Sequence, residues 1–190
     1  MNKTLLSAAL IAGFGIAAFA PQAASAATGT ITFNGKVLSS TCSVGTVTGG
    51  TVSSNNVAIT LPNVQSTAFT AQGSVAGLTP FSLNLTGCPT TPSGVSVGAA
   101  FSGAIDGSTG AIQNTSGTGF SNAEVQLTNS TGSTAFNLVT NPNPVSATIT
   151  GTGSNGAAIL SYGAQYYQPT ATAVTAGTVT AVVSYTLTYN

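Results

Sequence analysis

Few side chains in this chain could carry out chemistry. Its 190 residues include two Lys or Arg, two Asp or Glu and no His. General acid–base catalysis usually relies on His or on paired carboxylates, and only Asp106 and Glu124 are available. Asp106 precedes a glycine, where a turn accounts for its presence. Serine is abundant, but there is no His to activate it as a nucleophile. The sequence therefore argues against an enzyme.

Cys42 and Cys88 are the other residues with chemistry of their own. In an oxidising compartment, an even pair of cysteines predicts one disulfide. The alternative is a pair of metal ligands, which the lack of His and of a third thiol disfavours. We therefore expect a disulfide, and neither a metal site nor a cofactor.

The first 26 residues have the composition of a secretory signal peptide. Lys3 supplies the positive start, residues 5–20 form an apolar run, and Ala24-Ser25-Ala26 gives small residues at a cleavage site. The run is shorter than the roughly 20 residues that cross a bilayer comfortably, although a retained membrane anchor is the alternative. We expect export and a mature chain from Ala27. Lys36 would be its one basic side chain, too little to bind nucleic acid.

The rest of the chain predicts an all-β protein. Short alternating segments rich in β-branched residues are separated by Gly, Pro, Asn and Ser clusters, which is typical of a sandwich or barrel. Strands are predicted at residues 30–39, 56–61, 81–86, 95–102, 124–128, 147–149, 158–167 and 178–189. Loops are predicted at residues 45–54, 89–94, 107–119 and 141–144.

Two alternating segments lie at the ends of the predicted mature chain. The last has an apolar face formed by Val179, Ala181, Val183, Tyr185, Leu187 and Tyr189. The first has a face formed by Gly29, Ile31, Phe33, Gly35 and Val37. A chain end normally frays, so a long amphipathic strand at an end needs a partner. The simplest alternative is that both ends are ordinary strands within one closed sandwich.

Several segments together resemble type 1 fimbrial subunits of the chaperone–usher pathway. Residues 29–42, an alternating extension with a central Gly35 that leads to Cys42, are similar to the start of those subunits. Residues 81–88 are similar to the strand that carries their second cysteine. Gly177, fourteenth from the end, and the penultimate Tyr189 are similar to the C-terminal motif that the chaperone recognises.

The resemblance implies an incomplete immunoglobulin-like sandwich, completed by donor-strand exchange. It implies a signal peptide at 1–26, a donor-strand extension at 27–40 and a pilin domain at 41–190. In the family, a periplasmic chaperone fills the groove beside the last strand, and the extension of the next subunit replaces it at an outer-membrane usher. The implied donor residues are Gly29, Ile31, Phe33, Gly35 and Val37. The implied residues for the groove and for chaperone and usher recognition are Gly177, Val179, Ala181, Val183, Tyr185, Leu187, Tyr189 and Asn190.

The expected function is that of a structural subunit of a surface fimbria. Such a subunit would be exported through the periplasm, polymerise head-to-tail with neighbouring copies and support cell adhesion. One alternative is a minor adaptor or a glycan-binding adhesin-type subunit of the same pilus, although adhesins of the family carry an extra lectin domain. The other is a closed, monomeric, secreted β-sandwich, which would have no groove and form no polymer.

Overall fold

The computed structural model describes residues 32, 35, 37–38, 40–117 and 121–190. The chain divides into two units, Met1–Gly35 and Lys36–Asn190, and the fold is that of the second unit. The predicted signal peptide and the predicted donor residues Gly29, Ile31 and Phe33 lie outside the described residues. Among the described residues, no helix is both long enough and apolar enough to span a bilayer.

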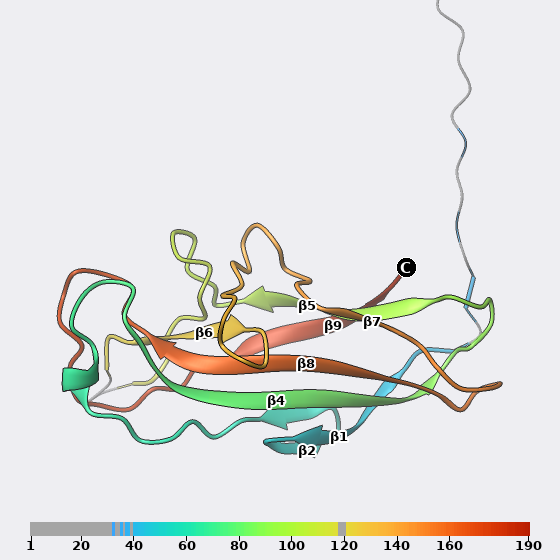
Figure 1. Ribbon diagram of the computed structural model, residues 1–190, viewed down its shortest axis with the longest axis horizontal. Helices are drawn as coiled ribbons and strands as arrows, with labels where there is room; N and C mark the ends of the chain where they lie inside the picture. The colour runs from blue at the N-terminus through green and yellow to red at the C-terminus, as the bar shows by residue number, and fades with distance from the viewer. Residues whose placement is uncertain (1–31, 33–34, 36, 39, 118–120) are drawn as a thin grey trace, which may run out of the picture. The chain divides into compact units, whose positions relative to one another are not determined.

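The second unit is built from antiparallel strands (Figure 1). Its elements are β1 (Ser43–Thr48), β2 (Thr51–Ser53), β3 (Asn56–Ala58), a 3-10 turn η1 (Ser66–Ala68), β4 (Val75–Cys88), β5 (Ser96–Gly103), β6 (Glu124–Thr128), β7 (Ser146–Thr148), β8 (Gly156–Tyr167) and β9 (Val183–Tyr189). One sheet has the order β1-β4-β8-β6, a second has the order β7-β5-β9, and β2 and β3 form a hairpin. The predicted all-β sandwich is confirmed.

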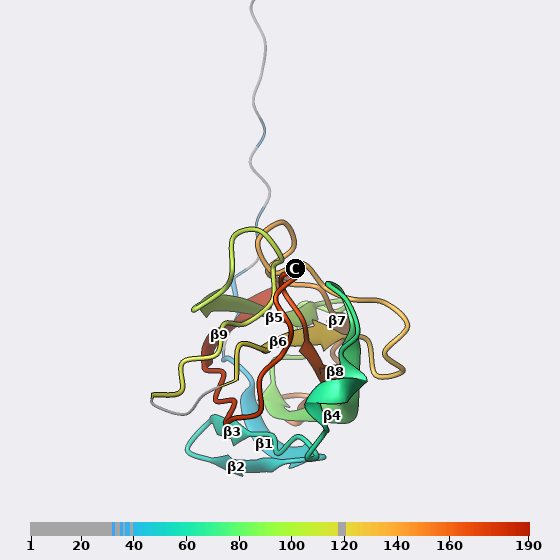
Figure 2. The ribbon, with the colours of Figure 1, turned by 90° about the vertical axis from the view of Figure 1, so that its left-hand side faces the viewer.

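The two sheets enclose one main apolar core. In the end-on view of Figure 2, β5 lies above and β1 and β2 lie below. Phe81, Leu83 and Leu85 alternate along β4 with the more exposed Ser82 and Asn84, as expected for a half-buried strand. Across the core, β5 contributes Val97, Ala99 and Phe101. The ring of the buried Tyr162 on β8 stacks on Phe81 at 5.4 Å and meets Phe101 edge-on at 5.5 Å, so aromatic contacts join the two layers.

The predicted disulfide is present between Cys42 and Cys88. It ties the residue before β1 to the last residue of β4. β1 and β4 are also paired directly, from Ser43 opposite Thr86 to Thr48 opposite Ser82. The disulfide therefore closes the end of a sheet pair that backbone hydrogen bonds already hold.

The prediction of a strand at 81–86 was too short, because β4 spans Val75–Cys88. The strand continues through a bulge, where its register with β8 shifts between Ala76 and Thr79. Gly77 stands at this bulge with φ of +71°, and a Cβ there would lie 3.1 Å from the Tyr166 ring. A glycine inside a strand can thus mark a bulge rather than the end of the strand.

The prediction of a loop at 45–54 was wrong. Residues 43–48 form β1 and residues 51–53 form β2. Gly45 lies where the register of β1 shifts, and a Cβ there would meet the Thr86 hydroxyl at 2.9 Å. Ser54 and Asn55 join β2 to β3 with φ values of 47° and 67°, the left-handed pair of a type I′ hairpin turn. The glycines and serines of this segment serve a bulge and a tight hairpin, not a loop.

The last predicted strand, 178–189, is only partly a sheet strand. β9 begins at Val183, opposite Gly103 at the end of β5, and runs to Tyr189 opposite Val97. Asn190 extends the pairing through two backbone hydrogen bonds with Ser96. β5 is the one sheet neighbour of β9 among the described strands. β9 is therefore an edge strand.

Candidate functional site

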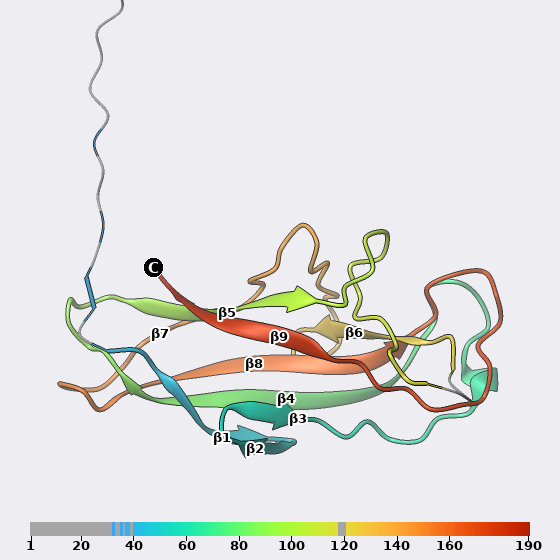
Figure 3. The ribbon, with the colours of Figure 1, turned by 180° about the vertical axis from the view of Figure 1, so that it is seen from behind.

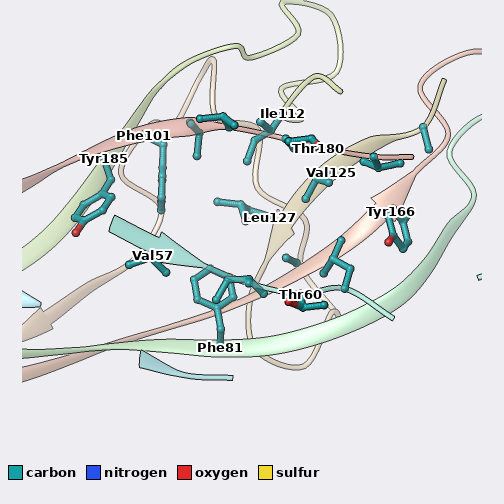
Figure 4. Close-up of a pocket in the computed structure, with 18 of the residues that line it drawn as sticks. Val57, Thr60, Phe81, Phe101, Ile112, Val125, Leu127, Tyr166, Thr180 and Tyr185 are labelled. Carbon is teal, nitrogen blue, oxygen red and sulfur yellow. The ribbon is translucent and has the colours of Figure 1, made fainter. Parts of the chain in front are cut away.

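A long groove lies between the C-terminal segment and residues 55–67 (Figure 4). Its cavity volume is about 1710 Å³. Small-molecule sites usually enclose roughly 300–1,000 Å³, so the groove is larger than such a ligand needs. Its length, along β9 and the chain before it, suits an extended peptide.

One wall of the groove is the C-terminal segment. The odd-numbered residues are half-buried and pack against the core, whereas Thr180, Val182, Ser184 and Thr186 are exposed. All the odd-numbered apolar residues named in the sequence line the groove: Val179, Ala181, Val183, Tyr185, Leu187 and Tyr189. Gly177 lines it as well, whereas Asn190 does not and is paired with Ser96.

The opposite wall is the chain that follows the β2–β3 hairpin, and sequence reasoning missed its role. Val57, Ile59 and Leu61 alternate with exposed neighbours, are half-buried and pack against the core. The predicted strand 56–61 is paired only over β3. Residues 59–65 belong to no sheet within the described chain. Figure 3 shows both walls on the side facing the viewer. The groove thus lies between β9 and an extended segment that no sheet covers.

The floor of the groove consists of core side chains from both sheets. Phe81 comes from β4, Phe101 from β5, and Val125 and Leu127 from β6, and Figure 4 shows them directed into the groove. Ile112, from a segment predicted as a loop, completes the floor. A row of alternating apolar side chains from a partner strand would therefore continue the core.

Two tyrosine hydroxyls reach from β9 to the other side of the groove. The Tyr185 hydroxyl donates to the carbonyl oxygen of Asn55 at 2.6 Å. The backbone N–H of Cys42 donates to the Tyr189 hydroxyl at 2.7 Å. Burial raises the pKa of Tyr185, so this hydroxyl keeps its proton and remains a donor at neutral pH. The first bond joins the two walls, and the second joins β9 to the residue before β1.

The two acidic residues lie outside the groove lining. The Thr109 hydroxyl donates to Glu124 at 3.0 Å and is 3.2 Å from Asp106. Backbone N–H groups of Thr109 and Ser108 hold the pKa of Asp106 below its usual value, whereas burial raises the pKa of Glu124. The described residues contain no cluster of His, Cys, Asp or Glu that could hold a metal ion. Asp106 therefore belongs to a turn and Glu124 to the start of β6, and neither lines the groove.

Two of the predicted donor residues, Gly35 and Val37, are described, and both are exposed. The Val37 side chain is 95 % exposed. The next residue, Leu38, instead packs against the core of its own unit. Adjacent apolar residues therefore face in different directions at this point, as the alternation of the sequence predicts.

Comparison with known proteins shows which family the chain belongs to. The family model for the type-1 fimbrial protein, A, matches residues 61–190. The chain belongs to the type-1 fimbrial protein family. It is 39 % identical over 180 residues to the F17 fimbrial protein of Escherichia coli, covering 92 % of this chain and 94 % of that protein. It is 37 % identical over 186 residues to the major fimbrial subunit SMF-1 of Stenotrophomonas maltophilia (strain K279a), covering 91 % and 99 %.

Solved structures confirm the fold. The rod subunit PapA of the P pilus is similar with a TM-score of 0.57 at 22 % identity, over 80 % of this chain and all of that one. A subunit of a chaperone–usher pilus, from a study of rod uncoiling, is similar with a TM-score of 0.51 at 23 % identity, over 90 % of this chain and all of that one. The fimbrial protein is thus a structural subunit of a surface pilus that assembles with other pilins, and not an enzyme.

Proposed function

We propose that the groove binds the N-terminal segment of a neighbouring copy and that the fibre grows by this donor-strand exchange. The donor face is Gly29, Ile31, Phe33, Gly35 and Val37. These side chains would lie over the apolar floor, and their backbone would pair with the free edge of β9. The single observation that carries the proposal is a long apolar groove between an edge strand and an extended segment outside any sheet.

The energetics favour such a complex. Burying Ile31, Phe33 and Val37 contributes about 5–9 kcal/mol before the cost of ordering the segment. Because the groove and the donor segment are different surfaces, the contact is head-to-tail and generates an open filament. The Val37 side chain is exposed in its own subunit and is therefore free to bind in the groove of another one.

The empty groove needs protection before assembly, because an exposed apolar edge strand aggregates. We infer that a periplasmic chaperone covers the groove and recognises Gly177, the odd-numbered face and the terminal residue Asn190. At an outer-membrane usher, the donor segment of the next subunit would then displace the chaperone. This route requires the signal peptide at 1–26, and it ends in an extracellular fimbrium that supports cell adhesion.

The test uses two complementary variants of the chain from Ala27. Phe33→Asp removes the central donor anchor, and Ala181→Glu places a charge in the groove. We expect neither variant alone to form head-to-tail fibres and the mixture to form a 1:1 dimer, because one intact donor meets one intact groove. Size-exclusion chromatography with light scattering measures the outcome.

The matched control is Thr186→Glu, which places the same charge on the exposed face of β9. It should polymerise like the unchanged chain. Polymers formed by the Phe33→Asp variant alone, or a mixture that stays monomeric, would contradict donor-strand exchange.

A further inference from the structure

We propose that Asn114 is a positioning residue that keeps the first part of the groove edge, Val179–Ala181, extended and able to pair with a donor strand. This inference rests on the proposed function. It concerns the part of the C-terminal segment that β5 does not reach, since β5 ends at Gly103 opposite Val183.

The segment before β9 is held instead by Asn114, Thr115 and Ser121, which lie 57 to 67 positions earlier in the chain. The Ser121 N–H donates to the Thr178 carbonyl oxygen at 3.0 Å, and the Thr115 N–H donates to the Thr180 carbonyl oxygen at 2.7 Å. Asn114 forms an isolated antiparallel bridge with Ala181. These residues take the place of β5 beside the segment 178–181 and form its backing.

The Asn114 side chain supplies bonds that the backbone of this backing does not make. Its amide nitrogen donates to the carbonyl oxygens of Thr178 at 2.9 Å and Ser121 at 2.6 Å. Its amide oxygen accepts from the N–H groups of Thr180 at 2.9 Å and Ser116 at 3.0 Å. A carboxamide offers two donors and two lone pairs, so its capacity is filled, and the four partners fix which way it points.

These bonds determine which backbone groups face the groove. Successive residues of an extended chain direct their N–H and C=O groups to opposite sides. Thr178 and Thr180 direct theirs to the backing, so Val179 and Ala181 direct theirs into the groove. Directly after β9, Asn190 exchanges backbone hydrogen bonds with Ser96 of β5. Because the two sides alternate, the even-numbered residues of β9 direct their N–H and C=O groups to β5, and the odd-numbered residues direct theirs to the groove. The edge is continuous from Val179 to Tyr189 only while Asn114 keeps residues 178–180 extended.

Amide hydrogen exchange can test this residue by residue. The reference is the chain from Ala27 with Phe33→Asp, mixed with a synthetic peptide of residues 28–40, so that the peptide is the one intact donor. We expect the peptide to slow exchange at Val179, Ala181, Val183 and Leu187 by at least roughly tenfold, because each N–H gains a partner. With Asn114→Ala added, the protection should be lost at Val179 and Ala181 and kept at Val183 and Leu187.

Two further variants sharpen the test. Asn114→Asp keeps the shape but replaces the amide donor with an oxygen facing two carbonyls, so it should give the same local loss, and it decides the question if the alanine variant does not fold. Asn122→Ala is the matched control, because Asn122 accepts from Thr175 N–H and donates to the Ala173 carbonyl, upstream of the edge. It should leave protection at Val179 and Ala181 intact.

The outcomes are distinct. Unchanged protection at Val179 and Ala181 in both Asn114 variants overturns the inference. Loss of protection at all four amides overturns it too, since Asn114 would then support the whole domain and not this edge. Absence of protection in the reference chain itself contradicts the proposed function, and it is seen before any Asn114 variant is measured.

Discussion

The hydroxyl of Tyr185 donates a 2.6 Å hydrogen bond to the carbonyl oxygen of Asn55, and this bond joins β9 to the turn between β2 and β3. The two residues lie on opposite walls of the groove. A donor strand that enters between the walls meets this bond. Before a donor strand binds, the Tyr185 hydroxyl therefore bridges the two walls, whereas the Tyr185 ring lines the groove.

Replacing Tyr185 with Phe removes the bond and keeps the ring. An exposed hydrogen bond contributes about 0.5–1 kcal/mol net. If the bond must open before the donor strand binds, it slows binding by roughly two- to fivefold. We expect the peptide of residues 28–40 to associate that much faster, as measured by stopped-flow fluorescence of a labelled peptide. Tyr167→Phe is the control, because Tyr167 does not line the groove. Equal association rates for the two variants would show that the bond is no barrier.

The disulfide should contribute strongly to stability. Cys42 and Cys88 are 46 positions apart, and closing a loop of that length stabilises a fold by about 4 kcal/mol on the chain-entropy view. We expect the double replacement with Ala to lower the free energy of unfolding of the peptide-bound chain by about that amount in urea titration. The unchanged chain under reducing conditions serves as the comparison. A difference below about 1 kcal/mol would mean that sheet pairing alone holds β1 to β4.

Glu124 should make the protein more stable in mild acid than at neutral pH. Its pKa is raised from 4.5 by burial, so the folded state favours the protonated form, and that stabilisation is lost as the pH rises through the raised pKa. No His is present to titrate in the same range. We expect the melting temperature to fall as the pH rises above 4.5, and to stay level in Glu124→Gln.

Asp106 acts in the opposite sense. Its pKa is lowered from 3.8 by the N–H groups of Thr109 and Ser108, so its stabilisation is present above its ordinary pKa and is lost as the pH falls below it. Asp106→Asn should therefore change the slope of melting temperature against pH mainly at the acidic end. An effect of Asp106→Asn on that slope confined to pH values above its ordinary pKa would contradict this prediction.

Assembled fibres should resist trypsin. Lys3 and Lys36 are the only basic side chains of the sequence, which has no Arg, and Lys36 belongs to the proposed donor strand. Strand exchange would place its peptide bond inside a sheet. We expect intact subunit to persist in trypsin-treated fibres, whereas the unassembled Phe33→Asp chain loses its first residues on the same gel. Rapid cleavage of fibres at Lys36 would indicate that the segment stays free.

The sequence predicts local features of this fold well. Residues 124–128 were predicted as a strand and form β6 with the same bounds, because their pattern is not interrupted by Gly or Pro. The alternation of residues 179–189 also predicted an amphipathic strand segment, and the cysteine pair predicted the disulfide. In each case the signal lies in neighbouring residues or in a rare residue type.

The features that were missed depend on partners far apart in the sequence. From the sequence, Gly45 indicates a loop. In the structure it lies at a bulge of β1, beside Thr86 of β4, where a Cβ would meet the Thr86 hydroxyl. Ile112 lies in a segment of loop composition, yet it forms part of the groove floor. Asn114 bonds to residues 64 and 66 positions away, and no local pattern marks such an asparagine. Long-range pairing decides these positions, and a single sequence does not display it.

The opposite directions of Val37 and Leu38 have a mechanical consequence. Leu38 packs into its own subunit, while Val37 points away from it. If Val37 is seated in the next subunit, the covalent link across each joint is a single peptide bond with no slack. Tension along the fibre would then reach the groove as shear, loading all the backbone hydrogen bonds of the exchanged strand at once. Each joint would yield as one unit and not by peeling, so the tensile strength of the fibre would depend on the length of the paired edge.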